Sequence, residues 1–231
     1  MNHMITILYQ DKDIIVADKP SGLLVHPYWK ETNEKECLMK KLRDQVGSYV
    51  HPAHRLDRPV SGPVIFSTQS EMIKEIQFNW HLANTKKQYI ALVKSKIELA
   101  GEFNFPLKSE KGMTQKARTL YQPLFVFENT TLVKVEIKTG RKHQIRRHFS
   151  RRCQNVIGDT KRGNSELNKF FREEHGLERI FLHCHRLAIE HPVTEQMIDV
   201  RSPLPENLMN VLLNLGLSHS EIEDKLKEHF I

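Results

Sequence analysis

The segment HRLDRPVSG, from His54 to Gly62, sets a single carboxylate, Asp57, between two arginines. Its proline and glycine interrupt any helical pattern, so the segment predicts a loop or a turn. The run GPVIFS that follows, residues 62–67, predicts a strand in which Pro63 must occupy one of the first positions or lie on an edge. A lone Asp at such a place is more often a turn or cap residue than a catalyst, so an active-site loop is the alternative that needs further support.

Patterns of apolar residues continue on both sides of this segment. Alternating or β-branched runs closed by glycine or proline predict strands, and apolar residues three or four apart predict helices. Strands are expected at residues 13–22, 23–25, 62–67, 86–94, 131–140 and 180–192, and helices at 30–47, 142–152 and 205–216, at 72–83 after a Ser70 cap, and after a capping box at Ser220–Glu223. The sequence therefore predicts one α+β domain over residues 1–231, with a mixed, mainly antiparallel sheet flanked by helices and loops, and with C-terminal helices in residues 205–231.

The overall charge of the chain favours a polyanionic partner. The 231 residues include 35 Lys and Arg against 28 Asp and Glu, a net charge of +7, so nucleic acid is the natural candidate and an anionic membrane surface the weaker one. Three widely spaced cysteines, Cys37, Cys153 and Cys184, indicate neither a disulfide framework nor a paired-cysteine metal site, and they favour a reducing cytoplasm. We expect no signal peptide and no membrane span. The expectation is a cytoplasmic monomer with no obligate protein partner.

The segment from Arg141 to Arg152 concentrates positive charge. It contains six Lys or Arg, two His and no acid. Like charges at helical spacing repel, so we expect an anion to relieve them: a phosphate backbone, an internal carboxylate, or both. The spacing of Ile145, Phe149 and Cys153 turns these three residues towards the core, which leaves Arg146 beside the buried stripe.

An arginine at the edge of a core needs a partner that offsets its desolvation. Asp57 is the most suggestive acid in the chain for this role. Arg147 and Arg151 point further towards solvent, where they can contact phosphate. The alternative is that Arg146 is a surface cation on a solvated face.

Metal and cofactor sites have little support in the sequence. His183 and His185 share one face of a strand, but a zinc site requires three or four convergent ligands, and this spacing matches no common zinc pattern. A metal-dependent nuclease would need clustered carboxylates, whereas the acids here are scattered. The glycine-rich phosphate-binding and dinucleotide-binding motifs and the GxSxG motif are absent from the sequence. We expect no metal and no cofactor.

Several segments resemble the motifs of the RluA family of pseudouridine synthases. HRLDRPVSG resembles the family signature HRLDxxTSG, whose aspartate is catalytic. DKPSGLLVH resembles the first family motif, KKQYIALV its lysine-x-tyrosine strand, TGRKHQIRRH its third motif, VIGDTKRG the segment after that motif, and FLHCHRLAIEHP the late strand of the family. The segments occur in family order and span nearly the whole chain, from Tyr9 to Pro203.

The resemblance implies the pseudouridine synthase catalytic fold and the isomerisation of uridine to pseudouridine in RNA. It implies that Asp57 is the catalytic acid, that Tyr89 is the aromatic residue beside the target base, and that Arg146 pairs with Asp57. Arg55 is implied to meet the RNA near the flipped nucleotide. The full set of expected RNA contacts is Arg55, His54, Ile145, Arg147, Arg151 and Lys87.

The resemblance also narrows the substrate. KHQIRRH and IGDTKRG are most similar to family members that modify uridine 65 in the acceptor stem of transfer RNA. The first strand begins by residue 13, so we expect no N-terminal S4-like domain. The alternatives are ribosomal RNA, another site in transfer RNA, and a non-catalytic RNA-binding module. Two residues just past Asp57 depart from the family pattern and can alter the hydrogen bonding of the loop: Val60 replaces the usual Thr, and Pro63 replaces an aliphatic residue.

Overall fold

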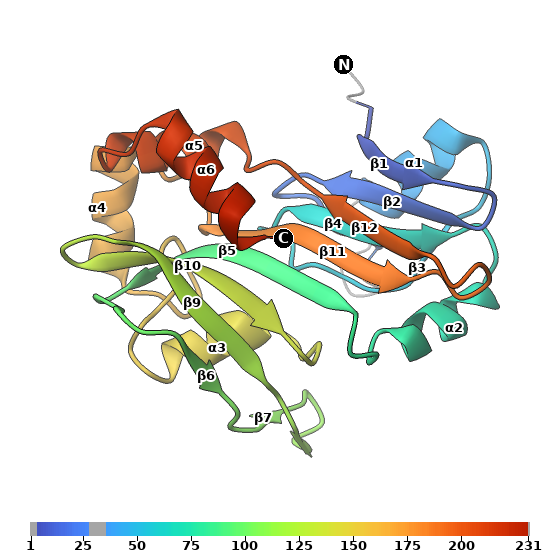
Figure 1. Ribbon diagram of the computed structural model, residues 1–231, viewed down its shortest axis with the longest axis horizontal. Coiled ribbons are helices and arrows are strands. Elements are labelled where there is room, and N and C mark those ends of the chain that lie inside the picture. Colours follow the sequence, from blue (N-terminus) through green and yellow to red (C-terminus); the bar gives the residue numbers. More distant parts are fainter. Residues whose placement is uncertain (1–3, 28–35, 231) are drawn as a thin grey trace. The chain divides into compact units, whose positions relative to one another are not determined.

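A computed structural model describes residues 4–27 and 36–230 of the chain (Figure 1). The chain forms two compact units, each assembled from two stretches of sequence. The first comprises Met1–Lys86 and Cys184–Ser202, and the second comprises Lys87–His183 and Pro203–Ile231. No shift in composition marks this division, and the single catalytic domain expected over residues 1–231 stays a prediction. Within the described ranges, no helix is both long and apolar enough to cross a membrane.

The first unit is built on a four-stranded antiparallel sheet in the order β1-β2-β4-β3. Strands β11 and β12 form a further antiparallel pair, which extends from Arg186 opposite Arg201 to Glu190 opposite Met197. The elements are β1 (Ile7–Gln10), β2 (Ile14–Lys19), α1 (Leu38–Val46), β3 (His51–Pro52), β4 (Gly62–Ser67), α2 (Met72–Asn79), β11 (Leu182–Glu190), whose first two residues belong to the second unit, and β12 (Met197–Arg201).

The core of the first unit follows the two-residue period of its strands. Alternate residues of β2 and β4 turn to one side, where residues of β11, β12 and α2 meet them. The buried cluster comprises Ile14, Val16, Ala53, Ile65, Ile76, Leu187, Ile189, Ile198 and Val200. The strand predicted at 62–67 is therefore confirmed to the residue, and those predicted at 13–22 and 180–192 are confirmed over Ile14–Lys19 and Leu182–Glu190.

Residues 23–25, expected as a short strand, are not one. The carbonyl groups of Leu24 and Val25 accept hydrogen bonds from the backbone N–H groups of Leu38 and Met39, at 2.8 and 2.9 Å. These donors belong to the first turn of α1, which has no side-chain cap. The segment therefore satisfies N–H groups that a helix leaves unpaired at its start. Of the helix expected at 30–47, the part over Leu38–Val46 is confirmed, and residues 30–35 lie outside the described residues.

The predicted Ser70 cap of α2 is wrong. The N-cap residue is Glu71, which makes no side-chain capping hydrogen bond, and the hydroxyl of Ser70 donates instead to the carboxylate of Glu71 at 2.8 Å. Helix α2 itself occupies Met72–Asn79 with Ile76 buried, so the apolar spacing predicted the helix but not its first residue.

The second unit contains the antiparallel strands β5-β10-β9-β6 in that order and a separate β7–β8 pair. Strands β5 and β10 pair from Lys94 opposite Thr130 to Gln88 opposite Glu136, as their alternating patterns predict. The elements are β5 (Lys86–Lys94), β6 (Gly101–Phe103), β7 (Leu107–Lys108), β8 (Thr114–Gln115), β9 (Thr119–Val126), β10 (Thr130–Ile137), α3 (Gln144–Ser150), α4 (Ser165–His175), α5 (Glu206–Asn214) and α6 (His219–His229).

Helices α4, α5 and α6 contribute to one large apolar cluster in the second unit, and α5 and α6 lie side by side in Figure 1. The cluster includes Ile90 and Leu92 of β5, Leu132 of β10, Phe171 of α4, Leu208 and Leu212 of α5, and Ile222 and Leu226 of α6. The C-terminal helices expected in residues 205–231 are confirmed within residues 206–229.

Helix α6 begins two residues earlier than expected. Its capping box is formed by Ser218 and Glu221: the Glu221 N–H donates to the Ser218 hydroxyl at 3.3 Å, and the Ser218 N–H donates to the Glu221 carboxylate at 2.8 Å. The S-x-x-E pattern also occurs at residues 220–223. Leu217 and Ile222, one residue before the cap and four after it, both join the apolar cluster, and this hydrophobic staple selects the earlier pattern.

Candidate active site

Asp57 lies in the loop that joins β3 to β4 in the first unit, and it is half-buried. Its carbonyl accepts a hydrogen bond from the Val60 N–H at 3.0 Å, so the acid opens a tight turn. Leu56 and Val60, both buried, anchor the loop on either side of Asp57. The interpretation of Asp57 as a turn residue is confirmed, and the same geometry holds its backbone in a defined place.

The turn after β2 is hydrogen-bonded to Arg58, the residue that follows Asp57 in this loop. The ammonium group of Lys19, which is fully buried, donates to the carbonyls of Pro20, Leu23 and Arg58 at 2.9, 2.7 and 3.0 Å. The Gly22 N–H donates to the same Arg58 carbonyl at 2.9 Å, and Arg58 Nε donates back to the Gly22 carbonyl at 2.9 Å. Carbonyl oxygens thus replace the hydration of a buried cation, and the two segments are fixed to each other.

His54 anchors the start of the loop, before Asp57, to β4 and Trp80. Its Nε2 accepts a hydrogen bond from the Ile65 N–H of β4 at 3.1 Å, and its ring packs on Trp80 with centroids 4.5 Å apart. Arg55, the next residue, is exposed and lies 3.5 Å from the ring of His26. His54 therefore has a structural role that the sequence did not indicate. The expected RNA contacts of His54 and Arg55 stay predictions.

The two departures from the family pattern fit the structure without strain. Val60 is 2% exposed, so the residue that replaces Thr fills apolar space. Pro63 lies second in β4, opposite Asp18 of β2. On its other side β4 pairs with β3 only at Phe66 and Ser67, so β3 does not need an N–H from Pro63.

Gly62 closes the loop where no side chain fits. Its φ is +126°, and a Cβ atom there would lie 2.2 Å from the carbonyl oxygen of Cys184, in β11. The Cys184 N–H also donates to the Ser61 carbonyl at 2.8 Å, which holds the two backbones together. The backbone of Cys184 cannot move aside without losing this bond.

We expect Gly62→Ala to destabilise the protein more than Gly47→Ala. Gly47 also has a positive φ, +73°, but nothing lies within 4 Å of its ideal Cβ position. Both variants add left-handed strain, and only Gly62→Ala adds backbone overlap, a difference of about 1–3 kcal/mol in the free energy of unfolding. Urea titration of the two variants measures it. Equal destabilisation would show that Cys184 yields readily.

Tyr89 and Lys87 lie on the same face of β5 in the second unit, because side chains alternate along a strand. Tyr89 is 8% exposed and lies opposite Val135 of β10. Lys87 is buried as well, and burial lowers the pKa of its ammonium to about 8, with the positive charge of Lys138 adding to the shift. The roles of Tyr89 beside the target base and of Lys87 in RNA contact stay predictions.

Arg146, in α3, forms a buried bidentate ion pair with Asp159. Arg146 Nε donates to Asp159 Oδ2 at 2.7 Å, and Nη2 donates to Oδ1 at 2.8 Å. The two side chains are 5% and 1% exposed. Burial alone would raise the pKa of Asp159, but the hydrogen bonds and charge of Arg146, with the N–H groups of Lys161 and Arg162, hold this pKa below its ordinary value. Asp159 therefore stays ionised beside the guanidinium.

The ion pair with Asp159 accounts for the burial of Arg146. Desolvation of the guanidinium requires an acid, and Asp159 meets that requirement, so burial alone no longer points to Asp57. The alternative of a solvated surface cation is wrong, because Arg146 is buried. Asp57 belongs to the first unit and Arg146 to the second. The pairing of these two residues stays a prediction.

The rest of α3 differs from the expected helix at both ends. Helix α3 spans Gln144–Ser150 rather than residues 142–152. Ile145 and Phe149 are buried as expected, but Cys153 is exposed, at a φ of +57° beyond the helix, so its predicted place in the core is wrong. The burial of Ile145 gives it a packing role, and its contact with RNA stays a prediction.

Three arginines contribute positive charge to the surface of the second unit and are called the cationic cluster: Arg147 of α3, Arg151 at the C-cap of that helix, and Arg162. Burial lowers the pKa of Arg147, and the positive charges of Arg162 and Arg151 lower it further. Among the ion pairs of the residues the structure describes, none involves these three side chains. Arg151 and Arg152 also lie over the ring of Phe105, at 5.3 and 5.7 Å from its centroid. Such a cluster is suited to an anion with several oxygens.

His148 adds no charge to this surface. It is fully buried, and burial lowers its pKa to about 4 despite the hydrogen bond to the Phe105 carbonyl. Its Nε2 donates to that carbonyl at 3.1 Å, and its Nδ1 lies 2.9 Å from the Thr119 hydroxyl. His148 is thus a neutral packing residue within a basic helix.

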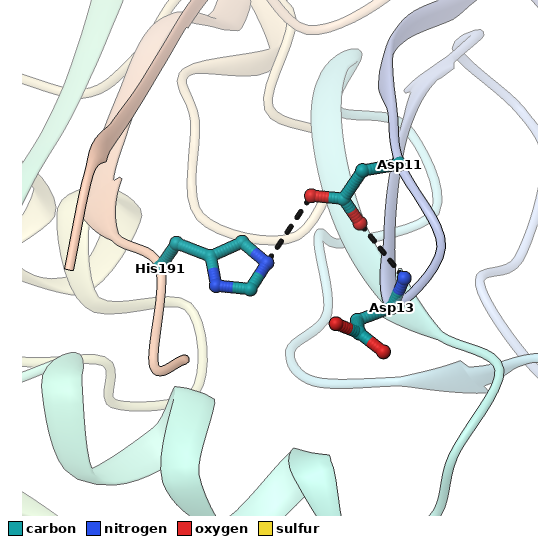
Figure 2. A group of neighbouring side chains, drawn as sticks. All are labelled: Asp11, Asp13 and His191. Carbon is teal, nitrogen blue, oxygen red and sulfur yellow. Dashed lines mark hydrogen bonds and ion pairs between the residues drawn. The ribbon is translucent and has the colours of Figure 1, made fainter. Parts of the chain in front are cut away.

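A possible metal-ligand group occurs at Asp11, Asp13 and His191 in the first unit (Figure 2). Their ligand atoms lie within 4.8 Å of one another, and no other such group of three or more occurs in the described part of the chain. His183 and His185, the pair considered from the sequence, are both buried but belong to no such group.

The hydrogen bonds of His191 oppose metal binding at this place. Its Nδ1 accepts from the N–H groups of Val193 and Thr194, at 3.1 and 3.2 Å. A neutral ring must therefore carry its proton on Nε2, which lies 3.1 Å from the Asp11 carboxylate. A metal on Nε2 would place a proton on Nδ1 against two N–H donors. The three residues instead link the turn between β1 and β2 to the turn after β11 by hydrogen bonds.

Comparisons with known proteins agree with these observations. The family model described as RNA pseudouridylate synthase matches residues 13–151. A protein of Vibrio cholerae named tRNA pseudouridine synthase C is 35% identical over 94% of this chain and 98% of its own length, and a protein of the same name from Vibrio vulnificus is 38% identical over 86% and 90%. The solved structure of human RNA pseudouridylate synthase domain containing 4 is 25% identical, with a TM-score of 0.75, and the similarity covers 92% of this chain and 93% of that one.

Proposed function

The chain belongs to the RNA pseudouridylate synthase family, and on this premise we propose that it isomerises uridine to pseudouridine in transfer RNA. The observation that carries the proposal is the similarity to the Vibrio cholerae protein named tRNA pseudouridine synthase C over 94% of this chain. Uridine 65 of the acceptor stem is the proposed target, on the likeness of KHQIRRH and IGDTKRG to members that modify it.

The reaction rearranges bonds within one nucleotide. The bond between N1 of uracil and C1′ of ribose breaks, the base turns, and a bond forms between C5 and C1′. The hydrogen of C5 leaves to solvent and N1 ends with a proton, so no electrons are gained or lost. Asp57 is the proposed catalytic carboxylate, and it acts in its ionised form as nucleophile or base. Attack on C1′, deprotonation of the sugar and attack on the ring are all open to it.

A paired uridine must leave its stem before it can react. Flipping costs a few kcal/mol, and stacking of a base on an aromatic side chain is worth about 1–3 kcal/mol. Tyr89 is the proposed stacking residue. Its phenol ring lies on a strand that is hydrogen-bonded along its length, so the ring would be held in place before the base arrives.

The cationic cluster of Arg147, Arg151 and Arg162 is the proposed contact with the RNA backbone. The mutual repulsion of three guanidinium groups falls when a phosphate lies among them, and this relief contributes to binding. The contact carries no base information, so it positions the stem rather than choosing the uridine.

We expect the double substitution Arg151→Ala with Arg162→Ala to weaken RNA binding while kcat at saturating RNA stays the same. The slope of log affinity against log salt should fall by about one for each arginine. Fluorescence anisotropy over a salt series measures this. Arg172→Ala, which removes an exposed arginine of α4, is the control. A lower kcat at saturating RNA, with unchanged affinity, would contradict the assignment.

Incubation with unmodified transfer RNA tests the proposal as a whole. Pseudouridine is mapped by chemical labelling and primer extension, in the presence and absence of a chelator. We expect a signal at uridine 65 that persists with the chelator. Ribosomal RNA is incubated in parallel, and a signal confined to ribosomal RNA would refute the transfer RNA assignment.

A further inference from the structure

We propose that Asp159 is a positioning residue for catalysis, which fixes the orientation of the Arg146 guanidinium. The inference rests on the proposed function, because it matters for turnover only if Arg146 serves the reaction. Asp159 lies outside residues 13–151, where the family model matches, and the sequence offered it only as part of VIGDTKRG.

The geometry of the pair defines one edge of the guanidinium. Asp159 accepts from Nε and Nη2 of Arg146, at 2.7 and 2.8 Å, so the plane of the group cannot rotate without breaking a charged hydrogen bond. The end of the group that carries Nη1 is not used by Asp159. The edge of the guanidinium that carries Nε and Nη2 therefore has a fixed direction.

Asp159 is itself held from several directions. Its Oδ1 accepts from the N–H groups of Lys161 and Arg162, at 3.0 and 3.2 Å. Its carbonyl accepts from the Gly163 N–H at 2.8 Å and from Asn168 Nδ2 of α4 at 3.1 Å. The position of the Asp159 carboxylate is therefore fixed by the turn and by α4, and this carboxylate in turn sets the orientation of the Arg146 guanidinium.

The same contacts give Asp159 a second consequence. Because its carboxylate receives the backbone N–H group of Arg162, the turn that holds Arg146 also fixes the backbone of Arg162. The pair and the proposed phosphate contact therefore share one turn, residues 159–163.

A second ion pair in the molecule provides a matched control. Arg186 and Asp199 form a bidentate pair through the same atoms, Nε and Nη2, at 2.9 and 2.6 Å, between β11 and β12 of the first unit. A purely structural pair loses stability when its acid is replaced, but turnover per folded molecule is unchanged. Asp199→Asn reports that outcome.

The test compares kcat and KM of Asp159→Asn with those of the wild type and Asp199→Asn, on unmodified transfer RNA and with the folded fraction measured. We expect kcat of Asp159→Asn to fall by about 10²-fold with KM changed less than threefold, because misdirection of a catalytic group acts on turnover. Asp199→Asn should keep the wild-type kcat. If Asp159→Asn does not fold, Asp159→Glu retains the charge but displaces the carboxylate, and we expect the same split with a smaller loss.

The substitution is repeated in an Arg146→Lys background to establish that Asp159 acts through Arg146. Lysine presents no fork for Asp159 to orient, so Asp159→Asn should lower kcat there by less than about twofold. An equal loss in both backgrounds, or unchanged kcat in an active enzyme, would refute the inference and leave the proposed function standing. An inactive wild type would refute the proposed function and the inference with it.

Discussion

Asp57→Asn is expected to abolish pseudouridine formation while RNA binding stays largely intact. Asparagine matches the shape of aspartate but offers no anionic oxygen, so it can act neither as nucleophile nor as base. Loss of such a group lowers turnover by about 10²–10⁴-fold. The turn is formed by the backbone, through the Asp57 carbonyl and the Val60 N–H, so the substitution should leave the loop in place.

Turnover is measured by mapping of pseudouridine in transfer RNA, and affinity by fluorescence anisotropy on the same transcript. Asp44→Asn, which removes an exposed carboxylate on α1 of the same unit, controls for the change in net charge. Substantial residual product from Asp57→Asn would show that another group carries the chemistry. Loss of binding together with turnover would assign Asp57 to the RNA interface instead.

Arg146→Ala is expected to destabilise the protein strongly as well as to lower its activity more than its affinity. The substitution leaves the Asp159 carboxylate, 1% exposed, without its counter-charge. Removal of one partner from a buried pair costs about 3–5 kcal/mol in the free energy of unfolding, because the remaining charge stays desolvated. Urea titration at neutral pH measures the loss.

Two further variants test the cause of this destabilisation. Arg146→Met combined with Asp159→Leu removes both charges, and it should recover most of the stability but none of the activity. Arg186→Ala should cost less than Arg146→Ala, since its partner Asp199 is 35% exposed and can be hydrated. A loss below about 1 kcal/mol for Arg146→Ala would show that Asp159 is relieved by other groups.

The alternation and helical spacing of apolar residues were enough to predict most of the long elements, but not strand β9 or helix α4 of the second unit. The strand at Lys86–Lys94 was predicted to the residue, because its apolar run, residues 89–93, lies between lysines at both ends of the segment. The boundaries that failed depend on neighbours distant in sequence. Residues 23–25 cap a helix that starts at Leu38, and Ser218 rather than Ser220 caps α6 because Leu217 and Ile222 share an apolar cluster.

The candidate site was predicted where a motif names the residue and missed where a folded turn creates the contact. Asp57 and Tyr89 came from motifs. Asp159 was missed because a pair between residues 13 apart, across the end of a helix and a turn, has no periodic signal. Lys19 was missed because a lysine followed by Pro20 and Gly22 predicts a solvated turn, and only the fold shows that carbonyl groups surround its ammonium.

The release of tritium from transfer RNA labelled at C5 of uridine tests the central claim most directly. Each isomerisation frees one C5 hydrogen, so the wild-type protein should release one equivalent of tritium per transcript. A transcript with cytidine in place of uridine 65 should release none. Absence of release from the unaltered transcript would contradict the claim that this chain isomerises uridine in transfer RNA.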